Sequence, residues 1–263
     1  MASNSPVHLQ VNTPHVEVCA VSDTGRVRTE NEDFLWIDKA GHFMLLCDGM
    51  GGHERGAEAS RTAVSVIQEY LGPEVINEEL REITGVDGVP SEIACLFSLV
   101  DEAVDKAATV LYERNRRLNL DRYMGTTVVG LVLVENQYVL WFHVGDSRLY
   151  RFRDAVLSCL TVDHSAYEEW VHNGRVGQEP GKNVITRAIG PNVGAVADIG
   201  WGKWRKDDVY MLCSDGLTDM LPDDEIAEMF TAGKNLDDTA LRLVDAANEA
   251  GGKDNISVVL CRI

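Results

Sequence analysis

Aspartates follow or precede several apolar, strand-like runs in this chain. Asp48 follows MLLC, Asp215 follows YMLCS, and Asp254 precedes ISVVL. Asp33 stands before FLWI, and Asp146 interrupts two strand-like runs in WFHVGDSRLY. Taken alone, each of these aspartates is explained as an ordinary turn residue. Together, carboxylates at strand ends converge on one rim of a sheet, where they could not all stay ionised without cations. Oxygen-only ligands favour magnesium or manganese over zinc.

Other interpretations of the glycine-rich stretch LLCDGMGGHERG (45–56) fail on spacing. A dinucleotide-binding fingerprint would need glycine where Glu54 stands, and a P-loop would need Gly-Lys-Ser/Thr. A calcium loop beginning at Asp48 would place Met50 and Ala59 at ligand positions. A cysteine phosphatase would need a phosphate-binding arginine soon after Cys47, and the chain has no G-x-S-x-G serine elbow.

Hydrophobic periodicity predicts elements in blocks. The first half contains strands in VEVCAVS, DFLWID and HFMLLCD, a helix over 54–71, an acidic surface excursion over 74–90 and a helix over 91–116. The second half begins with an antiparallel meander over 126–161, in which Asp146 occupies a strand-to-strand turn. A short helix over 164–173 and a glycine-rich loop over 174–194 follow. The chain ends with paired strands over 195–214, helices over 222–230 and 236–250, and a last strand, ISVVLCRI. Blocks of this kind indicate an α+β layered fold with antiparallel sheets.

Composition limits the classes of function. With 24 basic and 42 acidic residues the formal net charge is −18, which argues against binding to nucleic acid or to an anionic membrane surface. The longest apolar run, VVGLVLV, is far short of the ~20 residues of a membrane helix, and the N-terminus is not a signal peptide. The six scattered cysteines match neither a disulfide framework nor a zinc spacing, so we expect reduced cysteines and a cytoplasmic protein. We expect residues 1–15 to be a flexible tail and 16–263 a single domain.

Eight motifs in order resemble the metal-dependent protein phosphatases of the protein phosphatase 2C type, in their compact bacterial form. They are TGRVRTENED (24–33), LLCDGMGGHERG (45–56), MGTT (124–127), HVGDSRLYRF (143–152), LTVDHS (160–165), ITRAIG (185–190), LCSDGLTD (212–219) and GGKDNISVVL (251–260). The resemblance implies a four-layer α-β-β-α sandwich, in which two antiparallel sheets are flanked by helices. It implies hydrolysis of phosphoserine and phosphothreonine in proteins by a hydroxide that bridges two metal ions, Mn²⁺ or Mg²⁺.

The resemblance also assigns metal ligands. Asp48 would bridge the two metals, and Gly49 would offer its carbonyl to one of them. Asp215 and Asp254 would complete the shell of the first metal, and Asp33 would hold metal-bound waters or touch the metal. Asp146, with Asp215, resembles the residues that hold a third, weaker metal in bacterial members.

The resemblance also implies which residues bind and hydrolyse the substrate. Arg28 matches the phosphate-gripping arginine, whose planar fork can bind two phosphate oxygens. Met50 stands where members from higher organisms commonly have a candidate acid histidine, so His53 becomes the candidate for protonating the leaving alkoxide; a solvent-facing loop residue is the alternative. Residues 163–190 match the flap segment, where substrate choice is usually made. The remaining histidines, His8 among them, have no spacing that argues for a role.

The expected partners are phosphorylated proteins and the serine/threonine kinase that modifies them, with the chain acting as a monomer. The alternatives are a catalytically silent scaffold with the phosphatase fold and a phosphatase for small metabolites. Intact Asp48, Asp215, Asp254 and Arg28 argue against the scaffold.

Overall fold

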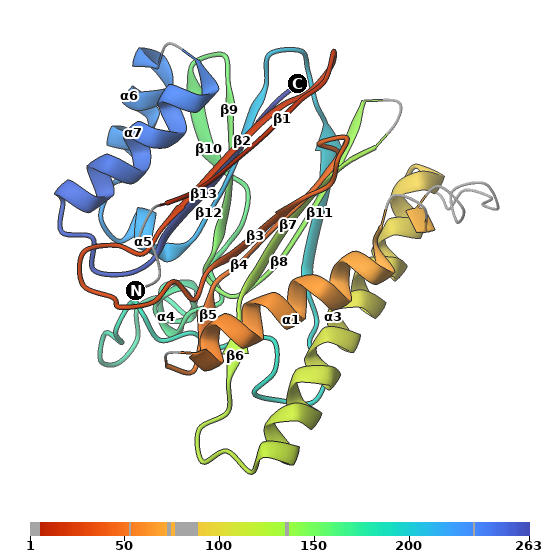
Figure 1. Cartoon of the computed structure of the whole chain (residues 1–263), viewed down its shortest axis with the longest axis vertical. Coiled ribbons are helices and arrows are strands. Elements are labelled where there is room, and N and C mark those ends of the chain that lie inside the picture. Colours follow the sequence, from red (N-terminus) through yellow and green to blue (C-terminus); the bar gives the residue numbers. More distant parts are fainter. Residues whose placement is uncertain (1–5, 53, 73–74, 77–88, 135–136, 234) are drawn as a thin grey trace.

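Two antiparallel sheets packed face to face form the centre of the protein (Figure 1). The structure, a computed structural model, describes residues 6–52, 54–72, 75–76, 89–134, 137–233 and 235–263. The six-stranded sheet contains β1 (Val7–Asn12), β2 (Glu17–Asp23), β13 (Ile256–Arg262), β12 (Val209–Cys213), β9 (Arg148–Arg153) and β10 (Val156–Cys159), in that order. The five-stranded sheet contains β11 (Asp198–Lys203), β8 (Tyr138–Val144), β7 (Val128–Val134), β4 (Phe43–Cys47) and β3 (Phe34–Ile37).

A small ribbon and six helices complete the described elements. The ribbon pairs β5 (Gly49–Met50) with β6 (Gly125–Thr126). The helices are α1 (Glu54–Tyr70), α3 (Ser91–Leu118), α4 (Ala166–His172), α5 (Asp215–Thr218), α6 (Asp223–Ala232) and α7 (Leu236–Glu249). In Figure 1, α1 and α3 cover the five-stranded sheet, while α6 and α7 cover the six-stranded sheet.

Alternation along the central strands explains the layers. In β4, Phe43 and Leu45 face the core under α1 and α3, whereas Met44 and Leu46 face the core between the sheets. All five β4 residues are buried because both faces of the strand are covered, so the strand is continuously apolar. Three hydrophobic cores therefore separate four layers, which confirms the predicted α-β-β-α sandwich.

The predicted meander over 126–161 is wrong as a single unit. β7 pairs with β8 in the five-stranded sheet, but β9 pairs with β10 and β12 in the six-stranded sheet. The chain crosses between the sheets at residues 145–147, so Asp146 lies in a crossover rather than in a hairpin turn. Likewise, the strands predicted to pair over 195–214 lie in different sheets, as β11 and β12. Periodicity identifies a strand but not its partner.

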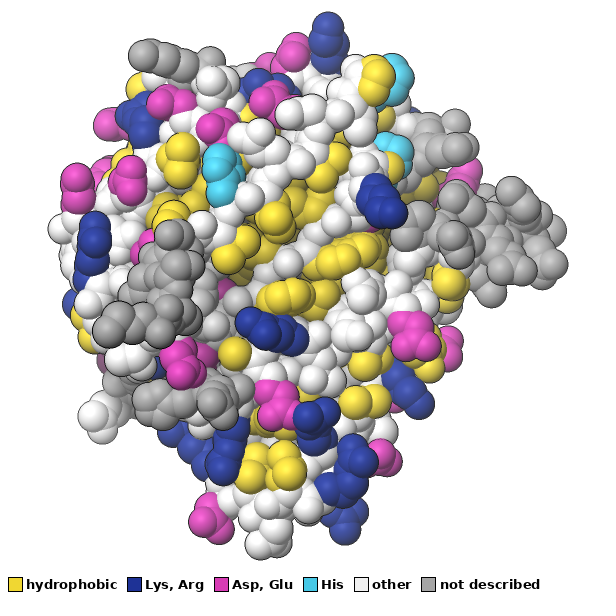
Figure 2. Space-filling model, viewed as in Figure 1, with side chains coloured by type: hydrophobic (Ala, Val, Ile, Leu, Met, Phe, Trp, Pro, Cys, Tyr) yellow, Lys and Arg dark blue, Asp and Glu magenta, His cyan; other side chains and the backbone are white. Residues whose placement is uncertain are grey.

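The flexible tail predicted over 1–15 is wrong for residues 7–12. They form the edge strand β1, paired with β2 from Val7↔Ser22 to Asn12↔Glu17. Most of its side chains are exposed, so it lacks the strong apolar signal of the central strands. Figure 2 shows a diagonal band of hydrophobic side chains across the face that carries β1, β2 and β3. Val11 of β1 and Ile37 of β3 are partly buried and pack on the inter-sheet core.

The six cysteines, all within the described residues, form no disulfide; four are buried, Cys95 is partly buried and Cys159 is exposed. The predicted excursion over 74–90 lies mostly outside the described residues. No helix in the described ranges combines the length and apolarity needed to cross a bilayer.

Candidate metal centre and substrate pocket

The strand register brings the predicted carboxylates to one end of the sandwich. Phe34 pairs with Cys47, so Asp33, just before β3, lies next to Asp48, just after β4. Cys213 pairs with Val258, which places Asp215 at the first turn of α5 near the start of β13. Asp254 stands two positions before the first residue of that strand, and Asp146 lies in the crossover between the sheets. All five predicted acidic residues therefore meet at one rim, which we call the carboxylate rim.

Burial and mutual repulsion oppose ionisation of these groups. Loss of solvent raises the pKa of Asp48 well above its usual value, and the charges of Asp33, Asp215, Asp146 and Asp254 add to the effect. Burial likewise raises the pKa of Asp33 to about 7 and that of Asp215 well above the ordinary range. Burial first, then the charge of Asp163, raises the pKa of Asp146 to about 6. A divalent cation would reverse this balance, because it favours the ionised carboxylates.

Unpaired oxygen atoms indicate where such a cation fits. Asp33 Oδ1, Asp146 Oδ1 and Asp215 Oδ1 are buried and have no hydrogen-bond partner among the described residues. A buried carboxylate oxygen without a donor is costly, and a metal ion satisfies it. The donor set consists only of oxygens, as hard cations such as Mg²⁺ and Mn²⁺ prefer. The residues present therefore fit the predicted metal centre.

Two threonines of the MGTT motif fix the backbone of Asp48. Thr127 Oγ1 accepts a hydrogen bond from Asp48 N at 3.0 Å. Thr126 Oγ1 donates to Asp48 O at 2.7 Å, and Thr127 N donates to the same oxygen at 2.9 Å. This clamp of three hydrogen bonds connects the end of β4 to β6 and β7. It holds the backbone of Asp48 in place, so the side chain extends from a defined position at the carboxylate rim.

Gly49 is required by close packing. A Cβ at this position would collide with the carbonyl oxygens of Gly56 in α1 and of Glu32. Glycine therefore lets the first turn of α1 approach the end of β4, in addition to any space it leaves for substrate. Its predicted role as a carbonyl ligand stays a prediction.

Asn255 organises the loop that carries Arg28. Its Oδ1 accepts from Glu32 N at 2.8 Å, and its Nδ2 donates to Thr24 O and Glu30 O at 2.9 Å each. Arg28 Nη2 donates to Asp254 Oδ2 at 2.6 Å, and the arginine side chain is 50% exposed. Arg28 thus reaches the carboxylate rim from the solvent side, as a phosphate-binding group must.

Ser214 supports Asp33 in a similar way. Its hydroxyl donates to Asp33 Oδ2 at 2.9 Å and accepts from Ser257 N at 3.0 Å. Sequence reasoning did not identify Ser214, Asn255, Thr126 or Thr127 as site residues. The available signal was their position within the same motifs as the aspartates.

Gly145 and His164 shape the crossover that presents Asp146. Gly145 has φ +111°, a conformation that side chains rarely adopt, and a Cβ there would meet the Thr127 side chain. Gly145 N donates to His164 Nδ1 at 3.0 Å, which links the crossover to the start of the flap segment.

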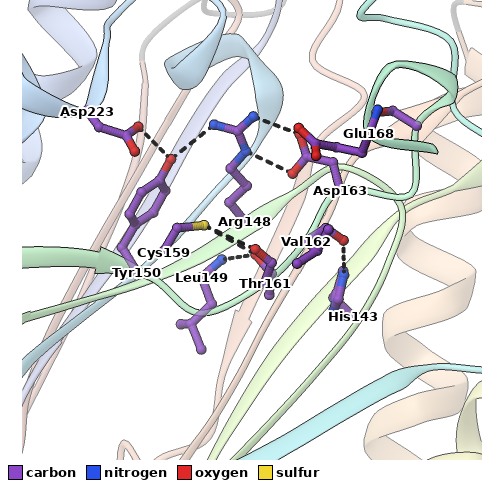
Figure 3. A network of polar contacts seen from close by, with 11 residues as sticks. His143, Arg148, Leu149, Tyr150, Cys159, Thr161, Val162, Asp163, Glu168 and Asp223 are labelled. Carbon is purple, nitrogen blue, oxygen red and sulfur yellow. Dashed lines mark hydrogen bonds and ion pairs between the residues drawn. The ribbon is translucent and has the colours of Figure 1, made fainter. Parts of the chain in front are cut away.

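A pocket of about 470 Å³ opens beside Asp146 and Asp215. The flap segment contributes Tyr167, Glu168, Lys182 and Asn183 on one side, and residues 218–223 form the other side. Figure 3 shows its polar support: Arg148 binds Asp163 through two hydrogen bonds of 2.8 and 2.7 Å, and Tyr150 donates to Asp223 at 2.9 Å. Arg148 and Tyr150 of β9 therefore hold two of the lining residues, Asp163 and Asp223, the latter in the first turn of α6.

The predicted site residues thus divide into two groups. The structure brings together Arg28, Asp33, Asp48, Gly49, Asp146, Asp215 and Asp254. His53 lies outside the described residues, so its role as the acid for the leaving group stays a prediction.

Comparison with known proteins gives a consistent result. The family model described as "Protein phosphatase 2C" matches residues 26–250. The serine/threonine phosphatase stp of Listeria monocytogenes is 33% identical over 247 residues, which cover 91% of this chain and 92% of that protein. The structure of the S. agalactiae serine/threonine phosphatase superimposes with a TM-score of 0.81 at 32% identity, over 95% of this chain and 100% of that one. The catalytic domain of the phosphatase PstP, solved in complex with 2 manganese ions, superimposes with a TM-score of 0.74 at 29% identity, over 94% and 97% of the two chains.

Proposed function

The chain belongs to the protein phosphatase 2C family of serine/threonine phosphatases, and on that basis we propose how its own residues carry out the reaction. Asp48, Asp215 and Asp254 bind two divalent metal ions, manganese or magnesium, together with the Gly49 carbonyl. Asp33 supports them, and Asp146 with Asp215 forms a third, weaker site. The observation that carries this proposal is the meeting of buried carboxylates at the carboxylate rim. Three of their oxygens, Asp33 Oδ1, Asp146 Oδ1 and Asp215 Oδ1, have no donor in the part of the chain that the structure describes.

Two such ions, held by these carboxylates, would supply an acidified water as the nucleophile and would neutralise charge on the phosphoryl oxygens. Arg28 binds and orients the phosphate. It gives one hydrogen bond to Asp254, and the other edge of its guanidinium fork can donate to two phosphoryl oxygens. His53 remains our candidate for donating a proton to the leaving serine or threonine oxygen.

The pocket beside the carboxylate rim accommodates residues next to the phosphorylated one. Its lining contains the acidic residues Asp146, Asp163, Glu168, Asp215, Asp219 and Asp223 against the cations Arg148 and Lys182. Asp163 is paired with Arg148, and the metal ions would neutralise Asp146 and Asp215. The remaining lining still has more acidic than basic groups, with Glu168, Asp219 and Asp223 against Lys182. We therefore expect basic or neutral phosphopeptides to be hydrolysed faster than acidic ones. Turnover of sequence-scrambled phosphopeptides at low and high salt tests this; faster hydrolysis of acidic peptides at low salt would contradict it.

The substrates are phosphorylated proteins, and the opposing enzyme is a bacterial serine/threonine kinase of the eukaryotic type. Action as a cytoplasmic monomer, without nucleic acid or membrane partners, also stays a proposal. The alternative of a silent scaffold is disfavoured because every predicted carboxylate is present at the carboxylate rim.

The test is turnover of a phosphothreonine peptide with added Mn²⁺, alongside an EDTA control and the Asp215→Asn variant. Metal-dependent turnover that the variant loses would support the enzyme and its metal centre together. A folded, manganese-loaded wild-type protein without turnover would favour the scaffold instead.

A further inference from the structure

A second group of metal-capable side chains lies on the outer face of the six-stranded sheet, under the first turn of α7. It consists of His8 on β1, Cys19 on β2 and Asp237 on α7. Gln10 pairs directly with Cys19, and His8 pairs with Val21, two residues further along β2. Residues two apart on a strand share a face, so His8 and Gln10 lie on the same side as Cys19, the side that α7 covers.

The three ligand atoms lie close together. His8 Nε2 is 2.6 Å from Asp237 Oδ1, Cys19 Sγ is 3.3 Å from the same oxygen, and Cys19 Sγ is 3.6 Å from His8 Nε2. Gln10 Nε2 donates to Asp237 Oδ1 at 2.6 Å. Asp237 Oδ1 is therefore in contact with the imidazole nitrogen of His8, the sulfur of Cys19 and the amide nitrogen of Gln10.

These separations approach those of a tetrahedral zinc site. With Zn–S of about 2.3 Å and Zn–N and Zn–O of about 2.0 Å, tetrahedral ligands are about 3.5 Å apart for S···N and S···O, and about 3.3 Å apart for N···O. Two of the three separations in the cluster already agree within a few tenths of an ångström. The third, between His8 and Asp237, must open by less than 1 Å, and His8 is on an exposed edge strand where such a shift is easy.

We propose that His8 Nε2, Cys19 Sγ and an Asp237 carboxylate oxygen bind a zinc ion, with a water as the fourth ligand. The thiolate and imidazole select zinc over the hard cations of the carboxylate rim. The half-exposed side chains of His8 and Asp237, 37% and 36% accessible, leave a route for the ion and room for the water. Gln10 donates the hydrogen bond that holds the Asp237 carboxylate in place, as partners of metal ligands commonly do.

Binding requires the loss of a proton from the thiol. Burial, the hydrogen bond to Asp237 and the charges of Asp237 and Glu17 raise the pKa of Cys19 to about 12. The neutral thiol therefore donates to Asp237 in the metal-free protein, and zinc replaces that proton with its own bond to sulfur. Zinc binding releases the proton to solvent, so affinity increases with pH.

The site would anchor an otherwise weakly held strand. β1 is an edge strand with mostly exposed side chains, and among the described strands its one neighbour is β2. A zinc ion shared by β1, β2 and α7 would tie residues far apart in sequence, because Cys19 and Asp237 are separated by 218 positions.

Cobalt(II) is the probe that separates this site from the carboxylate rim. Metal-stripped protein in millimolar Mg²⁺ is titrated with Co²⁺, and the near-ultraviolet charge-transfer band from thiolate to Co²⁺ is recorded. We expect a band that saturates near one equivalent and disappears when Zn²⁺ is added. The carboxylate rim contributes nothing to this band because its ligands are oxygens.

Matched variants make the result decisive. Cys19→Ser should abolish the band, and His8→Ala, which alters a half-exposed side chain and should fold normally, should weaken Co²⁺ binding at least ~10-fold. Cys159→Ser, which removes the exposed cysteine, should leave the band unchanged. A wild-type protein without the band, a band that persists in Cys19→Ser, a band of unchanged affinity in His8→Ala, or a band that excess Zn²⁺ does not remove would each overturn the proposal.

Discussion

The carboxylate rim and the His8–Cys19–Asp237 cluster differ in how their carboxylates are balanced by hydrogen-bond donors. The rim gathers like charges, and three of its buried carboxylate oxygens have no donor among the described residues, so its carboxylates repel one another unless a cation is present. The cluster combines a carboxylate with groups that donate to it, so it is satisfied without a metal. The rim should therefore depend on hard cations for both chemistry and stability, whereas the cluster should gain only local anchoring from a softer one.

The largest difference is expected in turnover. Asp215→Asn removes charge from the carboxylate rim and should lower kcat/KM on a phosphothreonine peptide by about 10³-fold, since the remaining groups stabilise the transition state poorly. His8→Ala should leave kcat/KM within about twofold. Asp154→Asn, which alters an exposed carboxylate, is the matched control. Equal losses in Asp215→Asn and His8→Ala would remove the distinction between the two regions.

A smaller effect is expected from Asn255, which holds the loop before β3 without being one of the predicted metal ligands. Asn255→Ala should weaken activation by Mn²⁺ about 10- to 100-fold, because supporting groups orient metal ligands and the loop carrying Asp33. Activity measured across Mn²⁺ concentrations should recover partly at high metal. Asn173→Ala, on an exposed helix end, should not change the Mn²⁺ dependence. A pure loss of kcat with unchanged Mn²⁺ dependence would contradict this positioning role.

The stability of the metal-free protein should depend on pH because the carboxylate rim contains groups with raised pKa values. Burial raises the pKa of Asp33 to about 7, so the folded state binds more protons than the unfolded state between about pH 4 and 7. Stability in EDTA should therefore decrease as pH rises through this window, by on the order of 3 kcal/mol. Denaturant midpoints at pH 5 and 7.5 measure this decrease. Asp33→Asn should reduce the slope without abolishing it, because burial also raises the pKa of Asp48, Asp146 and Asp215. Mn²⁺ should remove the slope, and a slope unchanged by either would show that groups outside the carboxylate rim are responsible.

The smallest expected effect concerns the cluster. With Mg²⁺ in excess, Zn²⁺ should raise the thermal midpoint of the wild-type protein by about 2–4 °C, the shift expected for roughly 1 kcal/mol in a chain of this size. His8→Ala should lose this increment while keeping its metal-free midpoint. An equal zinc increment in both proteins would place the ion elsewhere.

Element types were predictable because their signals are local. The helix predicted over 236–250 is α7, and the apolar runs HFMLLC and YMLC are β4 and β12, buried on both faces. The strand pairings were not predictable in the same way. β8 and β9 are separated by three residues yet lie in different sheets, since the choice of partner depends on which core each face must cover.

The residues of the candidate site were likewise predictable only in part. Asp33, Asp48, Asp146, Asp215 and Asp254 could be selected from motifs, because each stands at the boundary of a strand. Their support by Ser214, Asn255 and the Thr126–Thr127 clamp could not be, since hydrogen bonds between distant segments leave no local pattern.

The sequence by itself determined the layered α+β class, the family and the acidic residues available for metal chemistry. Only the tertiary structure decided that β1 joins the six-stranded sheet, that Asp146 reaches the carboxylate rim through a crossover, and that His8, Cys19 and Asp237 meet. The physical reason is that periodicity and turn residues act over a few positions. Convergence of side chains depends instead on sheet register and on the packing of α7, which bring together residues more than two hundred positions apart.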